Sequence, residues 1–171
     1  MSRSVPSIRE ETADDHAGIR EINHLAFGQD DEGRLVDALR EGAFARVSLV
    51  AEVDGQIVGH ILFSDLPIVT PEETLPALSL APMAVIPSHQ RRGIGSMLVR
   101  EGLRACRDAG HQIVIVLGHP EFYPRFGFSA KLAERLKSPF SGPAFMVLEL
   151  VPGALVGIEG EVRYPPPFKE I

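Results

Sequence analysis

The sequence predicts an α/β fold in which helices flank a mixed, mostly antiparallel sheet. Two observations favour this class. An apolar stripe at helical spacing over residues 94–109 lies between two strand-like segments, 74–86 and 113–117, and so forms a strand-helix-strand unit with parallel strands. Asp54-Gly55 joins two further strand-like segments, 47–53 and 56–66, and this dipeptide favours the tight turn of an antiparallel hairpin.

The first 42 residues are expected to form one strand and two helices. Residues 7–11 are typical of a short strand. Thr12-Ala-Asp-Asp15 resembles a capping box, and it begins a helix whose apolar face carries Ile19, Ile22 and Ala26. Residues 32–41 form the second helix, because Leu35, Ala38 and Leu39 recur at helical spacing and Gly42 supplies a stop.

The remaining elements follow the hairpin in chain order. Residues 74–86 are predicted as one strand with a bulge at Pro82, because proline cannot donate a ladder hydrogen bond. The helix over 94–109 ends at Gly110, and 113–117 is a central strand covered on both faces. A short helical turn at 120–125 and a last core strand at 145–150 complete the sheet.

The length of 171 residues indicates a single domain. We expect the domain to span residues 1–150. Residues 151–171 are either an extension of that domain or a flexible tail, in which 164–168 (Tyr-Pro-Pro-Pro-Phe) is extended and wraps the surface or is disordered.

Composition excludes several classes of function. The net charge of -6 argues against a nucleic-acid partner. No apolar run reaches the ~18 residues of a membrane span, and no signal peptide is evident, so we expect a cytoplasmic protein that does not bind membranes. Six scattered histidines and a single cysteine, Cys106, do not predict a metal site or a disulfide. A homodimer stays open.

The most informative stretch is residues 83–98, in which a strand leads into a glycine-bearing turn that begins a helix. First-turn amides of a helix have no intrahelical acceptors and can bind a diphosphate. Gly93 and Gly95 allow close approach of the main chain, and Arg91 and Arg92 add positive charge. The pattern lacks the Lys-Ser/Thr of a P-loop, and Leu98 stands where a dinucleotide fingerprint requires a third glycine.

Two motifs resemble the GNAT superfamily of N-acetyltransferases. Gln90-Arg-Arg-Gly-Ile-Gly95 resembles its Q/R-x-x-G-x-G/A signature, and Phe122-Tyr-Pro-Arg-Phe-Gly-Phe128 resembles its Y-x-x-x-G-F segment. The likeness extends over about residues 7–150. It implies a GNAT-like sheet with an acetyl-CoA site at the central strand-helix-strand unit, and transfer of the acetyl group to an amine of a small molecule or protein by direct attack.

The resemblance also implies roles for individual residues. The main chain of Met83 and Val85 would pair with the pantetheine amides of acetyl-CoA, and the amides from Arg91 to Ser96 would bind the diphosphate. Tyr123 would protonate the departing thiolate. The implied cofactor-binding residues are Met83, Ala84, Val85, Gln90, Arg91, Arg92, Gly93, Ile94, Gly95 and Ser96.

Several assignments stay open at this point. Many members of the superfamily carry an asparagine after the central strand, where this chain has Gly118-His119-Pro120. His119 is therefore a candidate substitute for that asparagine, and the role of Glu121 is ambiguous. No residue is assigned as the general base. Cys106 is expected in the core. Tyr123 is also explained by aromatic packing. A non-catalytic acyl-CoA-binding regulatory module is the main alternative, and a tRNA-linked amine acceptor is disfavoured by charge. Ten acids in residues 1–42 favour a cationic acceptor, bound by the early helices and the hairpin.

Overall fold

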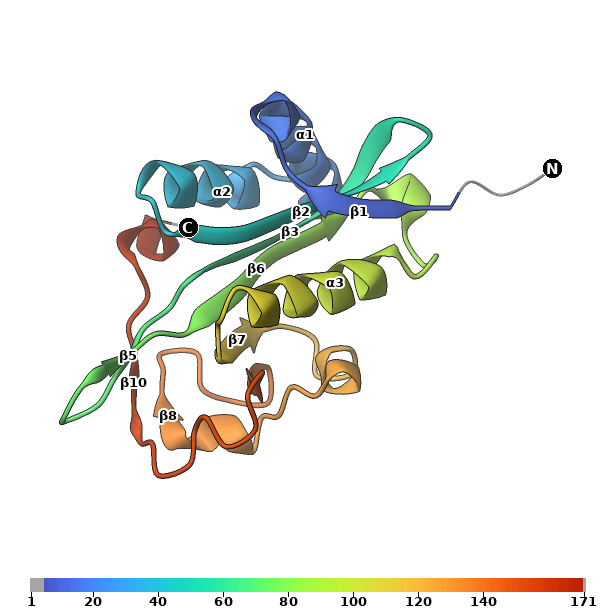
Figure 1. The fold of residues 1–171 in the computed structure, drawn as a ribbon. Coiled ribbons are helices and arrows are strands. Elements are labelled where there is room, and N and C mark those ends of the chain that lie inside the picture. The colour runs from blue at the N-terminus through green and yellow to red at the C-terminus, as the bar shows by residue number, and fades with distance from the viewer. Residues whose placement is uncertain (1–4, 171) are drawn as a thin grey trace.

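A computed structural model describes residues 5–170 of the chain, and its centre is a six-stranded sheet (Figure 1). The strand order is β1-β2-β3-β6-β7-β9, and every pair is antiparallel except β6 and β7. The fold class is therefore the predicted one. The strands are β1 Ser7–Glu10, β2 Ala45–Val53, β3 Gln56–Asp65, β6 Leu78–Val85, β7 Ile113–Leu117 and β9 Phe145–Glu149.

Helices cover both faces of this sheet. α1 (His16–Phe27) and α2 (Asp31–Glu41) pack on one face, where Ile19, Leu39 and Leu62 belong to one apolar cluster. α3 (Ile94–Asp108) packs on the other face, against Ile61 and Phe63 of β3. The predicted strand-helix-strand unit is β6-α3-β7, and its two strands are parallel as expected.

A second, smaller sheet, which lies below the first in Figure 1, was not predicted. Its order is β5-β4-β10-β8, built from β4 Ile68–Val69, β5 Thr74–Leu75, β8 Leu136–Lys137 and β10 Gly160–Val162. The prediction of one strand over 74–86 was therefore wrong, because residues 74–75 pair with β4 whereas β6 begins only at Leu78. Pro76 lies at the break, where it offers no N–H to continue the ladder.

Short 3-10 turns complete the chain: η1 Ala13–Asp15, η2 Pro87–His89, η3 Tyr123–Phe126, η4 Leu132–Arg135 and η5 Pro166–Glu170. The turn predicted at 120–125 is observed as η3. The extended conformation predicted for 164–168 is wrong, since η5 begins at Pro166, where the fixed φ of proline suits the first position of a helical turn. In Figure 1 this turn lies beside α2.

The bulge predicted at Pro82 is confirmed, and it lies where the sheet opens. On β3, Ile61 and Phe63 are two positions apart, whereas their partners on β6, Met83 and Leu80, are three positions apart, so β6 carries one extra residue. The pairing of β6 with β7 ends at Leu80 and Val116, although β6 continues to Val85. The two parallel strands therefore diverge from residue 81 onward.

Candidate active site

The divergence leaves one edge of β6 without a partner strand over residues 81–85. The amide of Ile86 donates to the carbonyl of Val58 at 2.9 Å, and pairing alternates along an antiparallel ladder. Ala84 therefore exchanges hydrogen bonds with His60, whereas the peptide groups of Met83 and Val85 point away from β3, toward the opening. Ala84 contributes to this edge only by spacing its two neighbours.

The turn before α3 brings donor groups to the same opening. Gly93 is the N-cap with φ +82°, and the first intrahelical bond runs from the Met97 amide to its carbonyl at 3.0 Å. The amides of Ile94, Gly95 and Ser96 consequently lack helical acceptors, and no side chain caps them. A Cβ added at Gly93 would meet no atom within 4 Å, so the space above the turn is open.

The residues predicted for this turn either hold it against β6 or lie exposed at the opening. Gln90 fixes the turn to the strand, because its Nε2 donates to the carbonyl of Val85 at 2.8 Å. Arg91 adopts φ +63°, and its side chain and that of Arg92 are exposed beside the open space. Gly95 packs against Met83, whose Cε would lie 3.4 Å from an added Cβ. The structure therefore brings the strand and turn residues together around one opening.

A cavity of about 580 Å³ adjoins the open edge of β6. Its walls include Ala81, Pro82 and Met83 of β6 and the α1–α2 connection. The end of β7 and the segment after it also contribute, through Leu117, Gly118, His119, Phe122 and Tyr123. The volume is that of an ordinary small-ligand site. The early helices contribute Phe27, Asp31 and Glu32 to the cavity lining, whereas no residue of the β2–β3 hairpin lines it.

Tyr123 forms part of the cavity wall although only 6% of it is exposed. Its ring packs edge to face against Phe122 and Phe128, with centroid separations of 5.0 and 5.7 Å. Gly118 leaves the space that the ring fills, since a Cβ there would lie 2.3 Å from Cε2 of Tyr123. Burial raises the pKa of Tyr123 to about 12, so the phenol stays protonated at neutral pH.

Several lining residues were missed by sequence reasoning. Leu117, Phe140, Tyr164 and Phe168 all line the cavity, and all four lie outside both motifs. No local pattern identifies them, because they come from separate segments of the sequence that only the fold brings together. His119 lines the cavity and Glu121 does not.

Covalent and metal chemistry find no support in the described residues. Cys106 has no exposed surface, and burial raises the pKa of its thiol to about 12. Within residues 5–170 no group of three or more His, Cys, Asp or Glu side chains could hold a metal ion. No helix in the same range is long and apolar enough to cross a membrane.

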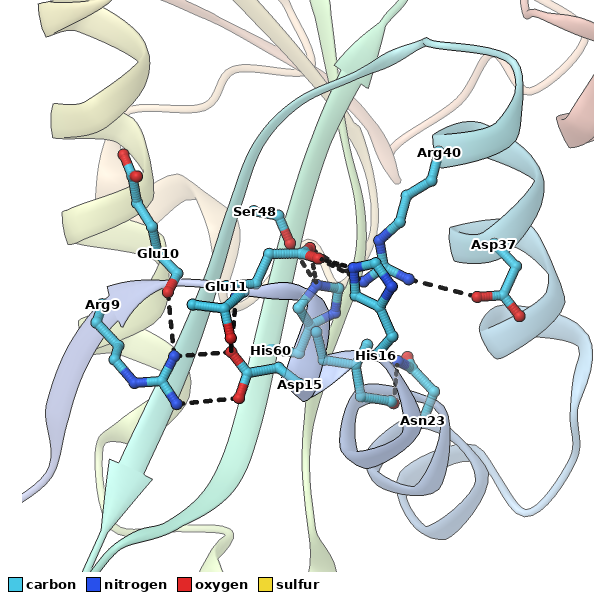
Figure 2. Close-up of polar contacts among 12 residues, drawn as sticks. Arg9, Glu10, Glu11, Asp15, His16, Asn23, Asp37, Arg40, Ser48 and His60 are labelled. Atoms are coloured by element: carbon cyan, nitrogen blue, oxygen red, sulfur yellow. Dashed lines mark hydrogen bonds and ion pairs between the residues drawn. The ribbon is translucent and has the colours of Figure 1, made fainter.

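A buried polar cluster lies between β2, β3 and the first two helices, and none of its residues lines the cavity (Figure 2). Arg40 donates to Glu11 at 3.0 Å, and Ser48 and Nε2 of His60 lie 2.8 Å apart. Burial opposes ionisation of Glu11, but hydrogen bonds from Arg40 and Ser48 outweigh it and lower the pKa of the carboxyl. Burial lowers the pKa of His60 to about 3, so the imidazole is neutral.

Fold and site together define an α/β protein in which an open strand edge and an uncapped helix N-terminus meet at one opening. A family model described as "Acetyltransferase (GNAT) domain" matches residues 7–130. The chain therefore belongs to the GNAT acetyltransferase family, and the sequence resemblance is confirmed.

Individual relatives extend the likeness over nearly the whole chain. N-acetyltransferase YhbS of Escherichia coli K12 is 37% identical over 160 residues, which cover 92% of this chain and 95% of that protein. A crystal structure of E. coli YhbS in complex with CoA has a TM-score of 0.89 and 35% identity, covering 99% of this chain and 94% of the other. A GNAT acetyltransferase from Brucella melitensis in complex with acetyl-CoA has a TM-score of 0.81 and 36% identity, with coverages of 96% and 99%.

Proposed function

We propose that the chain binds acetyl-CoA across the open edge of β6 and the first turn of α3, and passes its acetyl group directly to an amine held in the adjoining cavity. The observation that carries this proposal is the meeting of three features at one opening: the unpaired peptide groups of β6, the uncapped amides of α3, and a cavity lined by Tyr123. Relatives with CoA and acetyl-CoA bound support the choice of ligand.

The residues present fit that ligand. Met83 offers an N–H and a carbonyl on the free edge, and Val85 offers an N–H there while Gln90 already donates to its carbonyl. An amide-bearing arm can thus pair with β6 as an added strand does. The amides of Ile94, Gly95 and Ser96 suit a diphosphate, because they lie at the positive end of the helix dipole. Exposed Arg91 and Arg92 add charge.

Acetyl-CoA, when bound, would supply an activated thioester, and the protein supplies position and a hydrogen bond. The ammonium group first loses a proton to water, the amine nitrogen bonds to the acetyl carbon as the C–S bond breaks, and the thiolate leaves and takes up the proton that the attacking nitrogen releases. Tyr123 stays protonated because burial raises its pKa to about 12, so it can donate a hydrogen bond to a leaving sulfur throughout the neutral range. Such help is worth roughly 10² to 10⁴ in rate. The buried thiol of Cys106 is unsuited to attack, which favours direct transfer over a covalent enzyme intermediate.

Substituting phenylalanine for Tyr123 tests this role. The ring, and with it the packing against Phe122 and Phe128, is retained, so the melting temperature should change little. We expect kcat for CoA release from acetyl-CoA in the presence of an amine to fall by about 10² or more. The Kd for CoA, measured by titration calorimetry on the same variant, should stay within threefold. A wild-type kcat in the variant would remove Tyr123 from the mechanism.

A further inference from the structure

Part of the cavity lining is a row of three aromatic rings. Phe140, Tyr164 and Phe168 follow one another edge to face, with 5.2 Å between the centroids of each neighbouring pair. All three line the same cavity as Tyr123. Two of them come from the C-terminal segment, which the family model, ending at residue 130, does not include.

This aromatic wall is held in place by the rest of the fold. Tyr164 hydrogen-bonds with the Ser138 side chain, and the amide of Arg163 donates to the carbonyl of Pro67 at 3.0 Å. Phe168 packs against the apolar cluster between α2 and the sheet, and Figure 1 shows the C-terminal turn beside α2. The wall is therefore in position before any acceptor binds.

Aromatic side chains are concentrated at this cavity. Six of the chain's eleven aromatic residues line it: Phe27, Phe122, Tyr123, Phe140, Tyr164 and Phe168. Three of the cavity-lining residues are large apolar side chains that are each more than 40% exposed: Phe27, Leu117 and Phe140. Exposed apolar surface therefore gathers at the cavity, as it does at ligand-binding grooves. Core packing accounts for Tyr123 but not for exposed rings at a cavity mouth.

Negative charge lies on one side of the same cavity. Asp31 and Glu32, in the first turn of α2, both line it, and neither forms an ion pair with a described residue. The position of these acids at a helix N-terminus stabilises α2 by itself. Their position beside the rings, however, also gives the cavity a place for a cation next to an apolar surface.

We propose that the acceptor is a small primary amine carried on an aromatic body, of the arylalkylamine class. This inference rests on the proposed function and narrows its substrate. The aryl group packs against Phe140, Tyr164 and Phe168, while the ammonium group enters beside Asp31 and Glu32 and reaches the acetyl group after it loses a proton. A polyamine fits less well, because its additional charges would lose water against aromatic rings without gaining partners.

The first experiment compares acceptors at saturating acetyl-CoA by following free thiol release. The amines are benzylamine, 2-phenylethylamine and tryptamine, with ethylamine as the acceptor that lacks an aryl body, spermidine as a polycation and a lysine-containing peptide. We expect kcat/KM for the best arylalkylamine to exceed that for ethylamine by at least tenfold, and to exceed those for spermidine and the peptide.

The second experiment assigns this preference to the aromatic wall. Phe140→Ala is the main variant, because Phe140 is 44% exposed and its truncation should not unfold the protein; Phe168→Ala is the second. Each should raise KM for the arylalkylamine about tenfold and change kcat/KM for ethylamine by a clearly smaller factor, because ethylamine has no aryl group that contacts the wall. Val156→Ala, at an exposed position that does not line the cavity, is the matched control and should change none of these values.

The outcomes separate this inference from the proposed function. Equal kcat/KM for ethylamine and the arylalkylamines, better turnover of spermidine or the peptide, or an unchanged preference in both variants would overturn the aromatic acceptor and leave acetyl transfer standing. If none of the amines gives thiol release, the arylalkylamine acceptor is likewise overturned. Only absence of CoA binding by the same preparation would also remove the proposed function.

Discussion

Replacing Gly118 with alanine tests whether the position of the Tyr123 ring governs the reaction. The added Cβ would lie 2.3 Å from Cε2 and 2.8 Å from Cδ2 of Tyr123. Carbon atoms in contact are about 3.5–4.0 Å apart, so the ring has to move by roughly 1 Å. Because Phe122 and Phe128 hold the ring from the sides, we expect the overpacking to cost about 1–3 kcal/mol of stability.

The effect on catalysis should be larger than the effect on binding. A displacement of about 1 Å at a reacting group costs on the order of 10²-fold in rate, which is about 2.7 kcal/mol in activation free energy. We therefore expect kcat for thiol release to fall about 10²-fold in Gly118→Ala. The Kd for CoA, measured by calorimetry, should stay within threefold because the edge of β6 and the turn before α3 are untouched.

Gly102→Ala is the matched control. A Cβ at Gly102 would lie 2.4 Å from Cε2 of Phe63, so the same methyl group is forced against an aromatic ring, but neither residue lines the cavity. This variant should lose stability in urea unfolding while retaining the wild-type kcat per folded molecule. The reasoning is refuted if folded Gly118→Ala turns over at the wild-type rate, or if Gly102→Ala is equally slow.

Three further predictions follow from other residues. In Gly93→Ala the new side chain meets no atom within 4 Å, but the substitution strains a backbone φ of +82°. We therefore expect the free energy of unfolding to fall by about 1 kcal/mol and the Kd for CoA, measured by calorimetry, to rise roughly tenfold. An unchanged Kd would contradict the assignment of the turn to diphosphate binding. Cys106→Ala should keep the wild-type kcat, and native protein should not react with a thiol reagent at pH 8, because the thiol is buried with its pKa raised to about 12. The contribution of His60 to the free energy of unfolding should fall by about 2 kcal/mol from pH 7.5 to pH 5. In the unfolded chain the imidazole takes up a proton near its ordinary pKa of about 6.5. In the folded protein burial lowers the pKa of His60 to about 3, so it takes up no proton over this range. Urea unfolding of His60→Gln should lack that part of the pH slope, whereas an identical slope would show that His60 is not neutral in the fold.

The sequence was most informative where local chemistry alone determines structure. Asp54-Gly55 fixed the hairpin, and both residues adopt the positive φ that this turn requires. The stripe over 94–109 predicted α3 because its apolar face recurs every 3.6 residues. The missing N–H of Pro82 predicted the bulge at which β6 leaves β7. These features together located the candidate cofactor site.

The features that were missed depend on contacts between distant segments. The two-residue strands β4, β5 and β8 are too short to carry any periodicity, so the second sheet could not be predicted. Phe140, Tyr164 and Phe168 meet only because β10 joins that sheet and places the C-terminal segment beside α2. The aromatic wall of the cavity is therefore a property of the tertiary fold.

Titration calorimetry of the full chain with CoA and, separately, with pantetheine tests the diphosphate grip most directly. Both ligands carry the arm that pairs with β6, but only CoA offers phosphates to the amides of Ile94, Gly95 and Ser96. We expect CoA to bind at least about 100-fold more tightly than pantetheine, and its affinity to fall with added salt. Equal affinities, or no heat with CoA from folded protein, would contradict the account.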